Sequence, residues 1–196
     1  DFEAIESMTG HYDVAYAIWC VDHKTLYFTV PDRRMNAGDS YNEQTVTKIW
    51  KGADVLMTGE NMPGWIIVSS LAEHVVFDES FGRTRPTSCN GWFFNFDKLT
   101  NIEGLHHLCT SEVTTMASMF EGCTSLKELT LGFFDTSNVT DMNSMFSGCT
   151  SLEDLNLFEW ETQLVTDMEY MFCRCSNLRE LNLENFDTRS VTNMNL

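Results

Sequence analysis

Basic residues are scarce in this sequence of 196 residues, which has 12 Lys and Arg against 29 Asp and Glu and a formal charge of −17. A surface of this charge repels the phosphate backbone of DNA and RNA, so nucleic acid is not an expected partner. The sequence also lacks a run of 18 apolar residues, which is about the length that a transmembrane helix needs. No transmembrane segment is therefore expected in this chain.

Motifs that mark common active sites are missing as well. The sequence contains no GxSxG elbow, no HExxH pair, no GxGxxG loop and no phosphate-binding loop. Its recurring Met and Phe residues are explained as core positions at helical spacing. We therefore expect a non-enzymatic protein without catalytic residues and without a bound cofactor.

What the chain does contain is a repeat. The segments VTTMASMFEGC, VTDMNSMFSGC and VTDMEYMFCRC begin at Val113, Val139 and Val165, and VTNM begins at Val191. Successive starts are evenly spaced, because 139 − 113, 165 − 139 and 191 − 165 all equal 26. A fixed period in this range, without insertions, is typical of stacked repeats.

The apolar positions predict how one unit folds. Between residues 139 and 146 they recur at helical spacing, and Asn138 stands where a helix cap is expected. Leu155 and Leu157 then alternate with polar residues, which indicates a strand with one buried face. Each unit is therefore predicted to be a short helix, a turn, a strand and a turn.

Such a unit buries too little apolar surface to offset the entropy that its backbone loses on folding. Stacking the units lets their strands pair in parallel and places the helices together on the opposite side. The sequence therefore predicts an α/β solenoid: a right-handed leucine-rich-repeat coil with 26-residue repeats, a parallel sheet on one face and short helices on the other.

The repeat motif itself resembles a known family. LxxLxL followed by FDTSNVTDMxxMFxGCxxL resembles the BspA-like leucine-rich-repeat proteins of bacterial surfaces. VVFDESF at residues 75–81 and RPTSCNGWF at residues 85–93 resemble the lead-in before the first repeats of those proteins. The resemblance covers residues 71–196. It implies a secreted protein or surface lipoprotein, extracellular or at the cell surface, that binds host or bacterial surface proteins or glycoproteins.

The chain divides into two predicted parts. Residues 1–70 read as an N-terminal β-rich cap, with a hairpin over 14–21 and 25–30 and a third strand over 45–50. Residues 71–196 form the predicted solenoid, with a lead-in rung at 71–96 and repeats over about 97–196. The cap would cover the open edge of the parallel sheet.

The strand pattern also defines a candidate binding surface. Leu129, Leu131, Leu155 and Leu157 are expected to point inward, so the residues between them point outward. This outward set forms the predicted concave face, with Phe158 as its one exposed aromatic residue: Glu128, Thr130, Asp154, Asn156, Phe158, Glu180, Asn182 and Glu184. The alternative is a solvated sheet that binds nothing.

Cysteines and histidines suggest other chemistry only weakly. Cys123, Cys149 and Cys175 recur once in each repeat and are read as buried thiols, with a disulfide or a metal site as alternatives. His106 and His107, close to Cys109, are read as surface residues of a turn. Two Asp-Thr pairs are read as turn hydrogen bonding, with calcium binding as the alternative: Asp135-Thr136 and Asp187-Thr188. We therefore predict no metal site.

These observations predict a cell-surface adhesion or recognition module, and the alternative is a passive stalk that spaces another domain from the envelope. The chain starts at Asp1, so a signal peptide or lipid anchor is expected to lie outside it. Val191 and Met194 open a further unit that stops at Leu196. The edge of the last strand would then pair with more of the same chain, or with a second chain in an end-to-end dimer.

Overall fold

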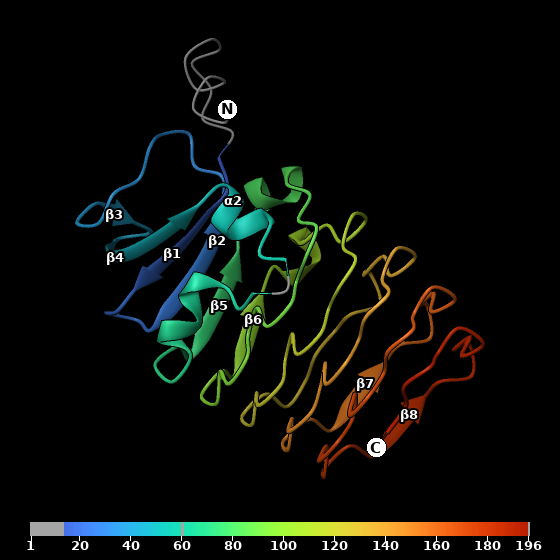
Figure 1. Ribbon diagram of the computed structural model, residues 1–196. Helices are drawn as coiled ribbons and strands as arrows, with labels where there is room; N and C mark the ends of the chain where they lie inside the picture. Colours follow the sequence, from blue (N-terminus) through green and yellow to red (C-terminus); the bar gives the residue numbers. More distant parts are fainter. Residues whose placement is uncertain (1–13, 60, 196) are drawn as a thin grey trace.

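The computed structural model describes residues 14–59 and 61–195, so residues 1–13 of the predicted cap lie outside the described part. Its regular elements are, in chain order, β1 (Tyr16–Cys20), β2 (Thr25–Thr29), β3 (Ser40–Tyr41), β4 (Gln44–Lys51), α2 (Ala53–Leu56), the 3-10 helix η1 (Gly64–Val68), β5 (His74–Phe77), η2 (Glu79–Arg83), β6 (Asn101–Glu103), η3 (Leu105–His107), β7 (Asp154–Asn156) and β8 (Glu180–Asn182). Most of the regular structure therefore lies in the first half of the chain (Figure 1).

The main sheet has six strands in the order β3-β4-β1-β2-β5-β6. β1 pairs antiparallel with β2 and with β4, while β2, β5 and β6 run parallel to one another. The hairpin expected over residues 14–30 and the third strand expected over 45–50 are thus present as β1, β2 and β4. The sheet continues across residue 70 through the parallel pairing of β2 with β5.

The predicted fold class is wrong. The structure is mainly a mixed six-stranded sheet with few helices, not an α/β leucine-rich-repeat coil with a continuous parallel sheet and a layer of helices. Beyond β6, the strands β7 and β8 form a separate sheet of two strands with three residues each. Within residues 108–195 the described chain contains no helix, and turns occupy the segments predicted to be helical.

Backbone conformation explains why those helices do not form. Ser118, Ser144 and Tyr170 have φ angles of 53°, 55° and 56°, and a left-handed residue ends a right-handed helix. The amides of Met142 and Phe146 donate to carbonyls of the following unit, Asp167 O and Met171 O, at 2.9 Å each. These donors would otherwise supply helical hydrogen bonds. Asn138, predicted as a cap, instead donates its side-chain amide to Ser111 O at 2.8 Å.

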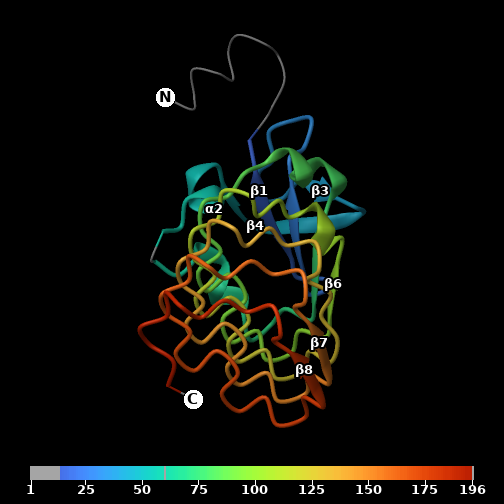
Figure 2. The same cartoon turned by 90° about the vertical axis from the view of Figure 1, so that its right-hand side faces the viewer.

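Equivalent segments of successive repeats nevertheless contact one another in register. Thr115 pairs with Asp141, Asp141 with Asp167 and Asp167 with Asn193, all in parallel. The loops of residues 88–195 consequently follow one another along the molecule (Figure 1) and largely overlap when it is turned by 90° (Figure 2). This hydrogen bonding between units replaces the local hydrogen bonding that helices would have provided.

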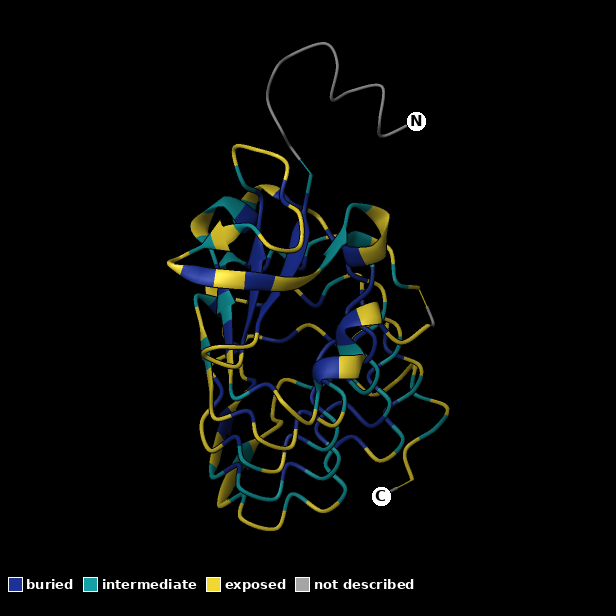
Figure 3. Cartoon of the chain, turned by 90° about the vertical axis from the view of Figure 1, so that its left-hand side faces the viewer, coloured by how far each residue is buried: buried dark blue, intermediate teal, exposed yellow. Residues whose placement is uncertain are grey.

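The core runs through both halves of the molecule. Buried aromatic rings of β2, β5 and the following loops pack together, with Phe28 stacked on Phe77 and on Trp92 at centroid distances of 4.6 and 5.3 Å. The stacking continues along the later units from Phe120 to Phe146 at 5.8 Å. Buried residues accordingly recur along the loops, with exposed residues between them (Figure 3).

Candidate functional site

The eight predicted binding residues do share one exposed face. All eight are exposed, whereas Leu155 and Leu157 between them are 4% and 0% exposed. Glu128 pairs in register with Asp154, and Asp154 pairs with Glu180, so three carboxylates follow one another across neighbouring strands. We call this set the strand face: Glu128, Thr130, Asp154, Asn156, Phe158, Glu180, Asn182 and Glu184.

Two asparagines shape the turns that end this face. Asn156 Oδ1 accepts a hydrogen bond from the backbone amide of Phe158 at 3.0 Å. Asn182 does the same for the amide of Glu184 at 3.0 Å. This local bonding is the usual role of asparagine in turns. It holds Phe158 at the end of its strand, where the side chain is 43% exposed.

The strand face carries two neighbouring recesses. One, of about 410 Å³, is bounded by residues 128–132 together with Asp154 and Asn156. The other, of about 290 Å³, lies between β6 and residues 128–130 and has Phe133 on its rim. Both recesses share residues 128–130, which therefore separate them.

A break in the sheet creates the smaller recess. β6 pairs with β5, and in the described part of the chain no strand pairing joins β6 to residues 128–130. After Glu103 the backbone turns away at Gly104, whose φ is 65° and where a Cβ atom would lie 2.2 Å from Phe77 O. Only glycine fits such a position. The chain then enters η3 instead of extending the strand.

Sequence reasoning missed one aromatic residue at this site. Phe133 is 41% exposed and lines the smaller recess, although it is not one of the eight strand-face residues, among which Phe158 is the only aromatic one. The ring of Phe133 also lies edge-to-face with that of His106, with 6.2 Å between the centroids. The sequence could have predicted this exposure. Phe134 lies 26 residues before Trp160, so the repeat places both residues in the core, where their rings stack. The neighbouring Phe133 is then left to point outward.

The cysteine ladder is largely buried, as predicted. Cys123 and Cys149 are 0% exposed, and Cys175 is partly buried. The Cys149 thiol donates to Phe120 O at 3.1 Å, and Cys175 repeats this contact with Phe146 O at 3.1 Å. Burial raises the pKa of Cys149 to about 12 and that of Cys175 to about 11. All the cysteines are free thiols.

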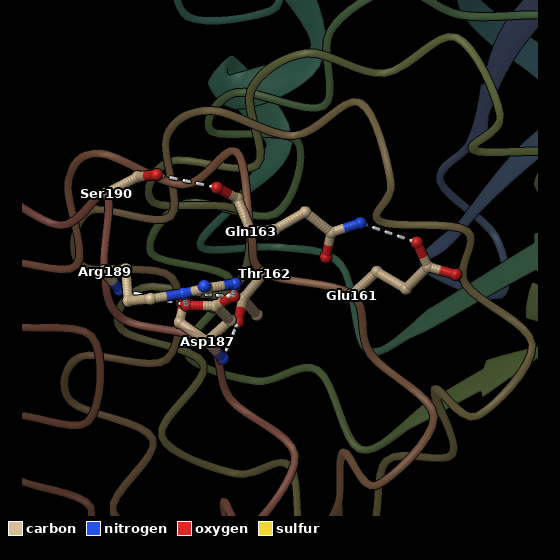
Figure 4. A network of polar contacts seen from close by, with 6 residues as sticks. All are labelled: Glu161, Thr162, Gln163, Asp187, Arg189 and Ser190. Atoms are coloured by element: carbon tan, nitrogen blue, oxygen red, sulfur yellow. Dashed lines mark hydrogen bonds and ion pairs between the residues drawn. The ribbon is translucent and has the colours of Figure 1, made fainter.

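The two Asp-Thr pairs take part in turn and inter-unit bonding. The Thr162 hydroxyl donates to Asp187 O at 3.2 Å and accepts from the Asp187 amide at 2.8 Å (Figure 4). Asp187 also accepts from Arg189 Nε at 2.9 Å, and this contact lowers the pKa of Asp187 to about 2. In the earlier unit the Asp135 carboxylate accepts from the Ser137 amide at 3.0 Å. These carboxylates stabilise turns of the chain.

A further recess, of about 490 Å³, is lined mainly by threonine and serine residues, including Thr87, Thr114 and Thr140. Thr114 Oγ1 donates to Thr87 O at 3.2 Å, and Thr140 Oγ1 donates to Thr114 O at 3.1 Å. These hydroxyls link one unit to the next, so the recess is best explained by the packing of the repeats.

The last unit leaves an apolar end surface. A recess of about 270 Å³ is lined by Met and Phe side chains together with Leu183. Leu183 is 36% exposed, whereas Leu157, its equivalent in the preceding repeat, is 0% exposed. The following unit covers Leu157, and residues 191–195 leave Leu183 uncovered. This uncovered surface is where the predicted end-to-end dimer would form, and the dimer itself stays a prediction.

Two further expectations concern metals and membranes. Across residues 14–59 and 61–195, no three His, Cys, Asp or Glu side chains gather closely enough to hold a metal ion. His106 and His107 lie ring to ring in the turn η3, at a centroid distance of 4.0 Å. In the same residues no helix has the length and apolarity needed to cross a bilayer.

Comparison with known proteins bears on the repeat-containing part. Residues 87–196 match the family model described as "Mycoplasma protein of unknown function, DUF285". The chain belongs to this family. The match to DUF285 begins beside Ser88, the residue that opens the series of parallel pairs by pairing with Thr115. No curated protein and no solved structure matches the chain.

Proposed function

We propose that this DUF285 protein is a non-enzymatic recognition module, secreted or displayed at a cell surface, that binds a surface protein or glycoprotein through the strand face. The observation that carries the proposal is the strand face itself. Its exposed carboxylates and amides and the ring of Phe158 lie beside two recesses, one of which is also lined by Phe133. The resemblance of the repeat motif to BspA-like bacterial surface proteins supports the location and the class of partner.

The exposed aromatic rings at this face support a role in binding. Exposed aromatic side chains commonly carry most of the binding energy of an interface, and polar residues around them exclude water. Phe133 and Phe158, 41% and 43% exposed, are such rings; Phe133 lies in the turn after residues 128–130, and Phe158 lies in the turn after β7. The buried leucines behind the face give these residues a packed support.

A binding screen with matched variants tests the proposal. The chain would be applied to a glycan array and to a panel of immobilised surface proteins, and Kd would then be measured for each binder. We expect Phe158→Ala to weaken binding by about 2 kcal/mol, roughly thirtyfold, as loss of an aromatic anchor does. Tyr170→Ala is the control, because Tyr170 is also 43% exposed but lies outside the strand face.

Equal effects of the two variants would place the binding surface elsewhere. The passive stalk makes a different prediction. If the chain is only a spacer, no panel member binds. Function then depends on the number of repeat units and is unaffected by surface substitutions.

A further inference from the structure

The smaller recess of the strand face is large enough to hold one long side chain. Its volume of about 290 Å³ is at the lower end of the roughly 300–1,000 Å³ that pockets for small molecules span. Leu105 and Leu129, 5% and 8% exposed, supply apolar walls. Glu128 and Phe133 line the same recess, so a single ligand group in it can contact both.

Charge identifies the kind of side chain that fits. The residues of β6, 128–130, β7 and β8 include four carboxylates and no basic residue: Glu103, Glu128, Asp154 and Glu180. Of the basic residues next to these strands, Arg179 is in an ion pair with Glu153 at 2.9 Å, and Lys127 flanks Glu128. The recess therefore opens onto a surface that attracts cations.

The combination of a carboxylate and an aromatic ring favours a guanidinium. A planar guanidinium can donate two hydrogen bonds to a carboxylate and can also lie over an aromatic face. A neutral sugar could stack on the ring of Phe133 and donate its hydroxyls to the carboxylates, but it carries no positive charge to complement the charge of this acidic surface. An acidic ligand would be repelled by them.

We propose that this recess binds an arginine side chain from an extended, basic segment of the partner protein, with the guanidinium between Glu128 and the ring of Phe133. The carboxylates of Asp154 and Glu180 then face further basic residues of the same segment. This inference rests on the proposed function and names the class of partner that the strand face recognises.

The probe is a fluorescein-labelled peptide, Thr-Arg-Thr-Arg-Thr, titrated by fluorescence anisotropy with the full chain. Its counterpart carries citrulline in place of arginine, which keeps the shape and removes the charge. We expect Glu128→Gln and Phe133→Ala each to weaken binding by about five- to twentyfold, and the citrulline peptide not to bind. Glu112→Gln, which removes one exposed charge from the turn before Val113, should change Kd by less than about twofold.

Thermal melting of each variant shows whether the fold is kept. Glu128→Gln was chosen because it removes the charge and preserves the shape of the side chain. Equal losses for Glu112→Gln and Glu128→Gln would reduce the effect to diffuse attraction by an acidic protein and would overturn the proposed site. Absence of peptide binding, or Kd values unchanged by both site variants, would overturn it as well. The proposed function would survive those results if Phe158→Ala still weakened binding to a surface protein or glycan.

Discussion

Leu157→Ala and Leu183→Ala form a matched pair that tests how the units stabilise one another. The two leucines occupy equivalent positions in successive repeats, and they differ in what covers them: Leu157 is 0% exposed and Leu183 is 36% exposed. Truncating a fully enclosed leucine removes its transfer free energy and leaves a cavity, which together cost about 2–5 kcal/mol. We expect Leu157→Ala to cost about 3 kcal/mol.

Leu183→Ala should cost roughly 1 kcal/mol, because the site is open on one side, so no closed cavity forms and only part of the transfer term is lost. For a chain of this length each kcal/mol lowers Tm by about 2–4 °C. The expected decreases in Tm are therefore roughly 10 °C for Leu157→Ala and roughly 3 °C for Leu183→Ala. Thermal melts measure these decreases in Tm, and urea melts, compared at equal m-values, measure the free energies of unfolding.

Equal losses for the two variants would refute this account, provided that the result does not depend on protein concentration. Repeating the melts over a hundredfold range of concentration separates the alternatives. If the cost of Leu183→Ala rises with concentration, a second chain covers the end surface, as in the predicted end-to-end dimer. Light scattering would then give roughly twice the mass of 22.5 kDa.

Other expectations concern the buried thiols and two glycines. Cys123 and Cys149 are 0% exposed, so a maleimide at pH 8 should label them only in denaturant, and fast labelling of the native chain would contradict their burial. Because burial raises the folded-state pKa values of Cys175 and Cys149 to about 11 and about 12, stability should be retained below about pH 9 and fall as pH rises through these values. Gly122→Ala should destabilise the protein by about 1–3 kcal/mol more than Gly148→Ala. Both glycines have φ of +75°, so the backbone strain is the same in the two variants. The new Cβ atom, however, would lie 2.2 Å from Asn95 Oδ1 at position 122 and 3.5 Å from its nearest neighbour at position 148. Equal losses would show that Asn95 moves aside at no cost.

The break beside β6 shows where sequence reasoning reached its limit at the candidate site. The eight strand-face residues could be named in advance, since alternation decides which side chains point outward. The recess between β6 and residues 128–130 could not, because it depends on how Gly104 turns against Phe77 O, a contact between segments that are distant in the sequence. The exposure of Phe133, by contrast, follows from the burial of its neighbour Phe134 in the core.

Two properties of this protein were set by its sequence alone, the repeat period and the identity of the buried face. Both follow from the recurrence of apolar residues such as Leu155 and Leu157, whose burial is favourable in any fold that keeps the strand alternation. Only the tertiary structure decided between helices and turns. The amide of Met142 can donate within its own segment or to Asp167 O of the next unit, and that second acceptor exists only after the units meet. The sequence of one repeat does not contain the hydrogen-bond acceptor that the next repeat supplies. The spacing of the apolar residues therefore predicted the burial of these residues correctly but their helical conformation wrongly.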